Sequence, residues 1–264
     1  MLRKRDATDD IIRVRGLTKG FSAQTVFENL DLTVRRGEIL GVVGASGTGK
    51  SVLLRTLLGI ERADAGSIEI FGRDMGGLSN SERIDVERRW GVLFQDGALF
   101  SSMTVLQNIQ TPMREQIRLP AAAMDDLARL KLAMVGLPAD AAHKYPSELS
   151  GGMRKRAGLA RALALDPEIV FLDEPTSGLD PIGAAAFDRL IQNLQKTLGL
   201  TVYMVTHDLD SIFAVCDRVA VLADRHVVRT GAPSELARDP RHAWIEQYFC
   251  GDRARAARAS SVEA

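Results

Sequence analysis

The segment that most constrains this chain is a glycine-rich run at residues 44–51, which matches the pattern G-x-x-x-x-G-K-[ST]. A short apolar run at residues 39–43 precedes it, and a helical pattern at residues 51–58 follows it. A strand, a close turn and a helix in that order are typical of a parallel β-sheet covered by helices. The segment therefore predicts an α/β fold.

The second half of the chain continues this alternation of strand and helix. Short apolar segments at residues 169–172, 201–205 and 218–222 are rich in β-branched residues, and helical patterns at residues 184–198 and 208–215 lie between them. Because these segments are apolar throughout, they predict strands that are buried on both faces, as in a parallel sheet.

Two other regions depart from this pattern. Residues 11–15, 26–34 and 67–71 alternate more between apolar and polar side chains, and they predict antiparallel strands beside the core. From about residue 99 to residue 164 the pattern is helical, which predicts a helical insertion in the α/β core. A tail at residues 250–264 is expected to fray. Four prolines are expected to break the inserted helices: Pro112, Pro120, Pro138 and Pro146.

The composition argues against several classes of protein. Lys+Arg and Asp+Glu both number 34, so the net charge is zero, which disfavours broad electrostatic binding to nucleic acid. Cys216 and Cys250 are too few for a disulfide framework and predict free thiols in a reducing compartment. No apolar run approaches the roughly 20 residues of a membrane span, and the charged N-terminus does not read as a secretory signal. If the protein serves a membrane, we expect it to act through partners.

The glycine-rich run is suited to phosphate. Glycines let the backbone wrap closely around phosphate oxygens, and successive N–H groups at the start of the following helix favour an anion. Lys50 would reach the β- and γ-phosphates of a nucleotide, and the Ser51 hydroxyl would ligate Mg²⁺. The positions expected to contact the nucleotide here are Gly44, Ala45, Ser46, Gly47, Thr48, Gly49, Lys50, Ser51 and Val52.

Polar side chains follow three other predicted strands. Asp173 and Glu174 end the apolar segment at residues 169–172, and consecutive strand residues point to opposite faces, so the two carboxylates can have separate roles. We expect Asp173 to hold the Mg²⁺ shell and Glu174 to orient or deprotonate the attacking water. His207 could donate a hydrogen bond to the γ-phosphate, and the amide of Gln95 could contact metal or water.

A second segment could bind an anion but lacks an enclosing loop. Ser150 is a good N-cap for a predicted helix at residues 153–165, and Gly151 and Gly152 expose backbone N–H groups at the positive end of its dipole. One such helix start cannot surround a nucleotide, but it could cover a nucleotide held by another subunit. Taken alone, an ordinary capped helix explains the segment equally well.

Together, these segments resemble the nucleotide-binding domain of ABC transporters. The loop at 44–51, Gln95, the signature segment at 149–152, Asp173–Glu174, the segment 177–180 and His207 occur in that family's order. The resemblance covers nearly all of residues 11–249, which it implies are a single nucleotide-binding domain. It implies a P-loop NTPase (RecA-like) parallel-sheet core with an antiparallel β subdomain and an inserted α-helical subdomain.

The resemblance also assigns roles along the chain. It implies that Phe21 stacks on adenine, that Gln95 is a metal and catalytic residue that also couples to the membrane subunit, and that Glu174 is the catalytic base with His207 as a switch. Asp180 lies in the segment that crosses the dimer interface. The signature residues Ser150, Gly151 and Gly152 would close on the ATP of a second copy of the chain, giving two ATP molecules between two protomers.

Local motifs narrow the resemblance further. Residues 94–105, the segment 149–156 and the segment 244–249 are similar to the Mla/Mce-type phospholipid transporter ATPases of Gram-negative bacteria. Met153 stands where most of the wider family has Gln, which removes a side-chain amide from the signature. The partners implied are inner-membrane permease subunits, an Mce-domain lipid carrier and a small STAS-domain protein, at the cytoplasmic face of the inner membrane.

Other functions remain open at this point. The cargo could be an amino acid or another small solute instead of phospholipid. An ABC ATPase acting on DNA or the ribosome would need a tandem cassette or a long coiled-coil insertion, and the sequence has neither. A nucleotide-dependent scaffold without turnover would not need Asp173, Glu174 and His207 together.

Overall fold

The computed structural model describes residues 9–22 and 24–251. The chain divides into two compact units. Unit 1 comprises Met1–Val86 and Val205–Ala264, and unit 2 comprises Glu87–Met204. Of the tail predicted at residues 250–264, residues 252–264 lie outside the described residues, and the boundaries of the predicted single domain stay a prediction.

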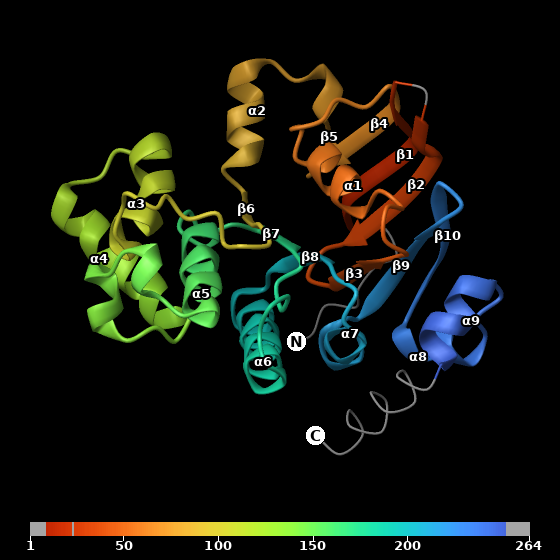
Figure 1. The fold of residues 1–264 in the computed structure, drawn as a ribbon. Helices are drawn as coiled ribbons and strands as arrows, with labels where there is room; N and C mark the ends of the chain where they lie inside the picture. The colour runs from red at the N-terminus through yellow and green to blue at the C-terminus, as the bar shows by residue number, and fades with distance from the viewer. Residues whose placement is uncertain (1–8, 23, 252–264) are drawn as a thin grey trace, which may run out of the picture. The chain divides into compact units, whose positions relative to one another are not determined.

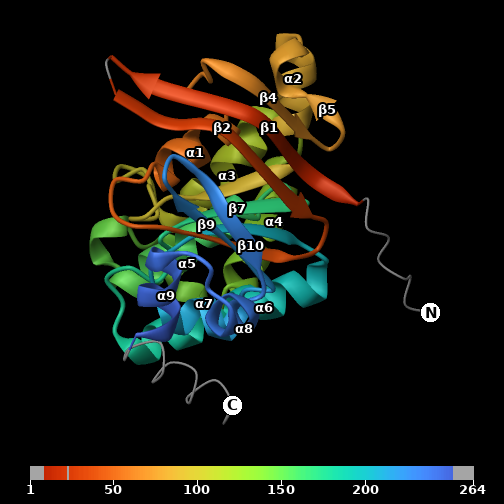
Figure 2. The same ribbon diagram turned by 90° about the vertical axis from the view of Figure 1, so that its right-hand side faces the viewer.

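The N-terminal part of unit 1 is an antiparallel sheet, shown in red and orange in Figure 2. Its strand order is β2-β1-β4-β5, where β1 is Asp10–Phe21, β2 is Gln24–Arg35, β4 is Ala65–Ile70 and β5 is Arg73–Asp74. In β1 the apolar side chains of Ile12 and Val14 are buried, while Arg13 between them is only partly buried. This alternation is the reason that the sequence indicated antiparallel strands here.

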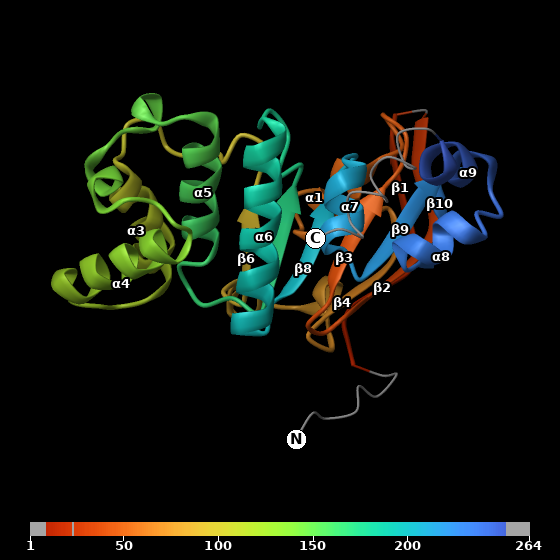
Figure 3. The same ribbon diagram turned by 90° about the horizontal axis from the view of Figure 1, so that it is seen from below.

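A second set of strands in unit 1 carries the glycine-rich run. Strand β3 (Ile39–Val43) is buried at all five positions and pairs in parallel with β9 (Arg218–Ala223), and β10 (His226–Gly231) pairs with β9 antiparallel. The helices of unit 1 include α1 (Lys50–Leu57), α7 (Leu209–Val215), α8 (Pro233–Arg238) and α9 (Ala243–Cys250). Helix α8 contacts both α9 and β10 (Figure 3).

Unit 2 combines parallel strands with a group of helices. Strand β6 (Trp90–Leu93) pairs in parallel with β7 (Ile169–Asp173), and most of β8 (Thr201–Val205) follows β7 in the strand order. Helices α3, α4 and α5 contact one another and form the group drawn in yellow and green in Figure 1. The helices are α3 (Val105–Gln116), α4 (Ala121–Met134), α5 (Gly151–Ala162) and α6 (Pro181–Leu198). The predicted α/β class, antiparallel strands and inserted helices are confirmed.

One of the predicted helix breaks is wrong. Pro120 and Pro138 lie at N-caps and Pro146 at the first turn of a short 3-10 helix, as expected, but Pro112 lies inside α3. An interior proline costs a helix about 3 kcal/mol. Helix α3 continues past it because a capping box secures its start and because Val105, Ile109 and Met113, on one face, are fully buried.

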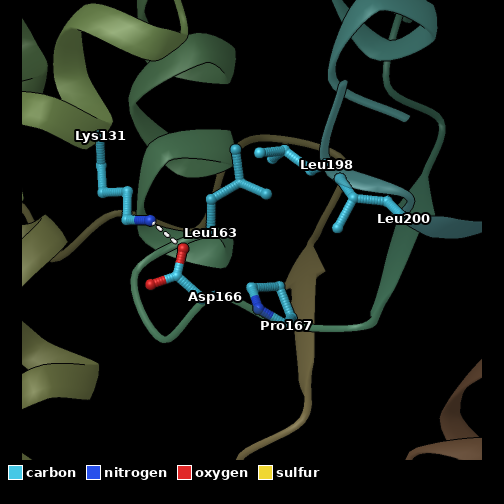
Figure 4. A pocket seen from close by; sticks show the side chains of 6 residues that line it. All are labelled: Lys131, Leu163, Asp166, Pro167, Leu198 and Leu200. Carbon is cyan, nitrogen blue, oxygen red and sulfur yellow. Dashed lines mark hydrogen bonds and ion pairs between the residues drawn. The ribbon is translucent and has the colours of Figure 1, made fainter. Parts of the chain in front are cut away.

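A buried lysine marks the lower part of unit 2. Lys131 on α4 is 3% exposed, and its ammonium forms an ion pair with the carboxylate of Asp166. The pair borders a small cavity of about 110 Å³ whose other walls are mostly leucine (Figure 4). The lining residues are Lys131, Leu163, Asp166, Pro167, Leu198 and Leu200. The aliphatic stem of Lys131 is thus part of the packing, and its charge is met by a side chain at the surface.

The close contact between β6 and α5 generates a prediction about stability. A Cβ added at Gly91 would lie 1.9 Å from the carbonyl oxygen of Ala162, which is backbone and cannot rotate away. We therefore expect Gly91→Ala to destabilise the protein by about 3 kcal/mol, measured by urea unfolding. Gly77→Ala is the matched control, because a Cβ there meets nothing within 4 Å, and it should change stability by less than about 0.5 kcal/mol. Equal stability of the two variants would contradict the contact.

Candidate functional site

The glycine-rich run forms a turn at the end of β3 with little room for side chains. A Cβ on Gly44 would lie 2.3 Å from the carbonyl oxygen of Leu222 and 2.8 Å from Thr48 Oγ1. Gly49, the N-cap of α1, has φ +96°, in the left-handed region that glycine adopts without strain. By contrast, a Cβ on Gly47 would meet nothing within 4 Å, so this turn is closed on the protein side and open toward solvent.

Lys50 extends over the turn. Its Nζ donates to the carbonyl oxygens of Gly44 at 2.8 Å and Ala45 at 2.9 Å. Because the N-cap of α1 is a glycine, no side chain caps the N–H groups at the start of the helix. An exposed turn, a helix start without a side-chain cap and an ammonium beside them fit a phosphate chain.

His207 lies near this turn within unit 1. The backbone N–H of Thr206 donates to the carbonyl oxygen of Val42, two residues before Gly44, at 3.3 Å. His207 follows directly and is exposed, and its own carbonyl accepts a hydrogen bond of 2.8 Å from the hydroxyl of Tyr248 on α9. Unit 1 therefore brings the phosphate-binding turn and His207 to the same ends of neighbouring backbone segments.

Phe21, the expected partner of adenine, ends β1. Its side chain is 43% exposed, and Nζ of Lys19 lies 4.7 Å from the centroid of its ring. An exposed aromatic ring next to a cation could accept a planar base by stacking. The role of Phe21 stays a prediction.

In unit 2, the two carboxylates are separated by a change in backbone conformation. Asp173 is the last residue of β7, and Glu174 has φ 49°, which is in the left-handed region and uncommon for a residue with a side chain. The sequence-based argument that strand alternation separates the two side chains is therefore wrong in its reason. A turn separates them, and its hydrogen bond runs from the N–H of Ser177 to the carbonyl oxygen of Glu174 at 3.2 Å.

Gln95 lies in a turn that α5 supports. The turn follows β6, and the N–H of Gly97 donates to the carbonyl oxygen of Phe94 at 2.8 Å. The guanidinium of Arg161 on α5 donates to the carbonyl oxygens of Gly97 and Ala98, at 2.9 and 2.6 Å. The side chain of Gln95 is exposed, so the turn is fixed through its backbone while the amide group faces outward.

The signature segment begins α5 as expected. Ser150 is the N-cap, and its hydroxyl accepts a hydrogen bond of 3.3 Å from the N–H of Met153. Gly151 and Gly152 are partly exposed. Asp180 is also an N-cap, because its carboxylate accepts a hydrogen bond of 2.9 Å from the N–H of Gly183 at the start of α6. Asp180 thus has a structural role at this position whether or not it also contacts a nucleotide.

One residue near the site was missed by the sequence analysis. Lys155 belongs to the charged run that follows the signature, but its side chain is 5% exposed, and its Nζ donates to the carbonyl oxygen of Glu174 at 2.9 Å. Burial lowers the pKa of Lys155, although the carboxylates of Asp96, Glu174 and Asp173 act in the opposite direction. Its position four residues before the buried Leu159 was the available signal, because such a spacing places two side chains on one helix face.

The predicted site residues therefore fall into two groups. Unit 1 holds Phe21, residues 44–52 and His207, and unit 2 holds Gln95, the signature residues, Asp173, Glu174 and Asp180. Within each unit the structure places them at strand ends or helix starts. That the two groups contact one nucleotide stays a prediction. Among the described helices, none is long and apolar enough to cross a membrane.

Comparisons with known proteins agree with this arrangement. The family model described as ABC transporter matches residues 27–177, which is more than half of the chain. The probable ribonucleotide transport ATP-binding protein mkl of Mycobacterium tuberculosis is 43% identical over 92% of this chain and 67% of its own length. The intermembrane phospholipid transport system ATP-binding protein MlaF of Escherichia coli is 39% identical over 88% of this chain and 86% of its own length.

A solved structure supports the same assignment. A dimeric ATP-binding cassette in a post-hydrolysis state, bound to ADP and Pi, has a TM-score of 0.77 and 28% sequence identity. The match covers 84% of this chain and 98% of that one. Cassettes of this kind bind and hydrolyse ATP, dimerise and pair with membrane permeases. The chain therefore belongs to the ABC transporter family and is an ATP-hydrolysing subunit of an ABC transporter.

Proposed function

We propose that this ATPase powers the transport of phospholipid between membranes. The observation that carries the proposal is the similarity to MlaF, which extends over 86% of that protein's length and is accompanied by the motifs at residues 94–105 and 149–156. The similarity to mkl, whose name refers to ribonucleotide transport, keeps a small solute as the second candidate cargo.

The residues of unit 1 would bind the triphosphate. The turn at residues 44–49 and the start of α1 supply backbone N–H groups, and Lys50 would exchange its two carbonyl partners for phosphate oxygens. Phe21 would hold the adenine ring, and Val52 would contact the nucleotide from the first turn of α1. These contacts would fix the position of the γ-phosphate, and positioning provides most of the catalysis in phosphoryl transfer.

The donors for a metal are hard oxygen atoms. The Ser51 hydroxyl, the Asp173 carboxylate and the Gln95 amide oxygen form a set with one charge, which suits Mg²⁺ that is also bound by phosphates. When bound, Mg²⁺ would neutralise negative charge on the β- and γ-phosphates. Glu174 would accept a proton from the attacking water, and His207 would donate a hydrogen bond to the γ-phosphate.

A second copy of the chain would complete each site. The signature on α5 has a capped helix start with partly exposed glycines but no enclosing loop, so it fits a phosphate held by another protomer. The further partners we propose are inner-membrane permease subunits, an Mce-domain lipid carrier and a small STAS-domain protein. The ATPase would then act at the cytoplasmic face of the inner membrane, without nucleic acid.

The Lys50 contacts generate a prediction about affinity. Lys50→Ala should weaken ATP binding by roughly 10- to 100-fold, because it removes a charged donor worth about 1.5–3 kcal/mol. Binding of a fluorescent ATP analogue would measure this change. Lys144→Ala is the control, because Lys144 pairs with Asp140 at the surface of unit 2 and lies outside the site. Unchanged affinity in Lys50→Ala would count against the phosphate role of the turn.

The role of Glu174 can be tested separately from binding. Glu174→Gln keeps the size of the side chain but removes the basic oxygen, so we expect kcat to fall by about 10²- to 10⁴-fold while ATP still binds. Phosphate release and size-exclusion chromatography with ATP should show little turnover and an accumulated dimer. Turnover at the wild-type rate would remove Glu174 from the role of base.

The cargo is tested by purifying the ATPase with its membrane partners. Mass spectrometry should find permease subunits with bound phospholipid, and phospholipid in nanodiscs should raise the ATPase rate of the complex. Stimulation by an amino acid or nucleotide with no response to phospholipid would favour the small-solute alternative and reject the lipid proposal.

A further inference from the structure

The candidate base has a backbone conformation that needs support. Glu174 has φ 49°, and a residue with a side chain is uncommon in this region because its Cβ approaches the following carbonyl group. Such conformations persist only where the surrounding structure fixes them. The direction of the Glu174 carboxylate depends on this backbone, since Glu174 follows the last residue of β7 and begins a turn.

Two donors meet the carbonyl group of Glu174. One is the N–H of Ser177, at 3.2 Å, which closes the turn. The other is the Nζ of Lys155, at 2.9 Å, which comes from α5. The lysine contact is shorter than the turn's own hydrogen bond and carries a charge, so it is the stronger of the two.

Lys155 is held in the charged state by its surroundings. Its side chain is 5% exposed, and a buried ammonium is unfavourable unless opposite charges are near. The carboxylates that favour its charge are those of Asp96, Glu174 and Asp173, which belong to the Gln95 turn and to the end of β7. A lysine in this setting is tied to the candidate site and is not a solvated member of a charged run.

Helix α5 connects this contact to the signature. The helix starts at Gly151 after the Ser150 cap, and Lys155 is on its second turn. On the same helix, Arg161 donates to the backbone of the Gln95 turn. Displacement of the signature would therefore move, through one rigid element, the groups that hold the base and the Gln95 turn.

We propose that Lys155 is a positioning residue for hydrolysis, which sets the direction of the Glu174 carboxylate through the hydrogen bond to its backbone and transmits movement of the signature helix to it. The inference rests on the proposed roles of Glu174 and of the signature. Lys155 does not touch the nucleotide in this account. Its effect on the reaction passes through the turn that begins at Glu174.

The experiment compares Lys155→Met with Lys155→Gln. Methionine keeps the length and packing but cannot donate, whereas glutamine is neutral and still offers an N–H donor. We expect kcat to fall by about 10- to 100-fold in Lys155→Met with ATP KM changed less than about threefold, because misplacing a catalytic group by about 1 Å has an effect of this size. Lys155→Gln should recover part of the loss.

A second measurement needs no nucleotide. Amide hydrogen exchange at Ser177 should speed up by roughly tenfold in Lys155→Met, since the turn would open more often, while exchange at Leu163, whose N–H bonds to Leu159 at the end of α5, should not change. Lys131→Met is the matched control, because it removes another buried lysine of unit 2 whose partner, Asp166, is outside the site. It should alter neither Ser177 exchange nor kcat.

Each outcome bears on the proposal. Wild-type kcat and wild-type Ser177 exchange in Lys155→Met would overturn it, as would equal loss in the Met and Gln variants, which would show that charge and not the donated bond matters. Faster exchange at both Ser177 and Leu163 would reduce Lys155 to a packing role and also overturn it. If the wild-type protein showed no ATPase activity, the proposed roles would fail, and the exchange result at Ser177 would still test the contact itself.

Discussion

The structure depends on strands that are buried on both faces and end abruptly in polar residues. Strand β3 ends at the phosphate-binding turn, β6 at Gln95, β7 at Asp173 and β8 just before His207. Within a parallel strand, the backbone hydrogen bonds are satisfied by neighbouring strands, and the apolar side chains are covered by helices. Only at the strand ends do polar side chains and free helix starts become accessible. Chemistry is confined to these ends by the same burial that stabilises the fold.

Helix α5 is the second element on which the site of unit 2 depends. It begins with the signature, donates through Lys155 to the backbone of Glu174, and donates through Arg161 to the Gln95 turn. Its close approach to that turn requires that both sides be small: a Cβ on Gly158 would lie 3.0 Å from Cα of Gly97. Three segments that are distant in the sequence are therefore supported by one helix, which explains why charged side chains are retained on its buried face.

The predictability of the fold followed the range of the interactions involved. The glycine-rich turn and the caps at Ser150 and Asp180 were predictable because their geometry depends on residues close in sequence. Helix α3 continues through Pro112 because burial of one face outweighs the local cost, which no local pattern reveals. Strand β10, which is half-buried along most of its length, gave no strong apolar pattern and was missed. The left-handed Glu174 and the burial of Lys155 depend on contacts nineteen residues apart and could not be predicted from spacing alone.

The hydrogen bonds of Lys50 have a consequence for how tightly any anion can be held. Its ammonium already has two carbonyl acceptors, from Gly44 and Ala45, so the turn and the lysine form a closed local arrangement of their own. An incoming phosphate competes with these internal acceptors, and the affinity that results is the difference between two satisfied states. Such an exchange limits the depth of the bound state and lowers the barrier to release, which favours a motor that must let go of its product in every cycle.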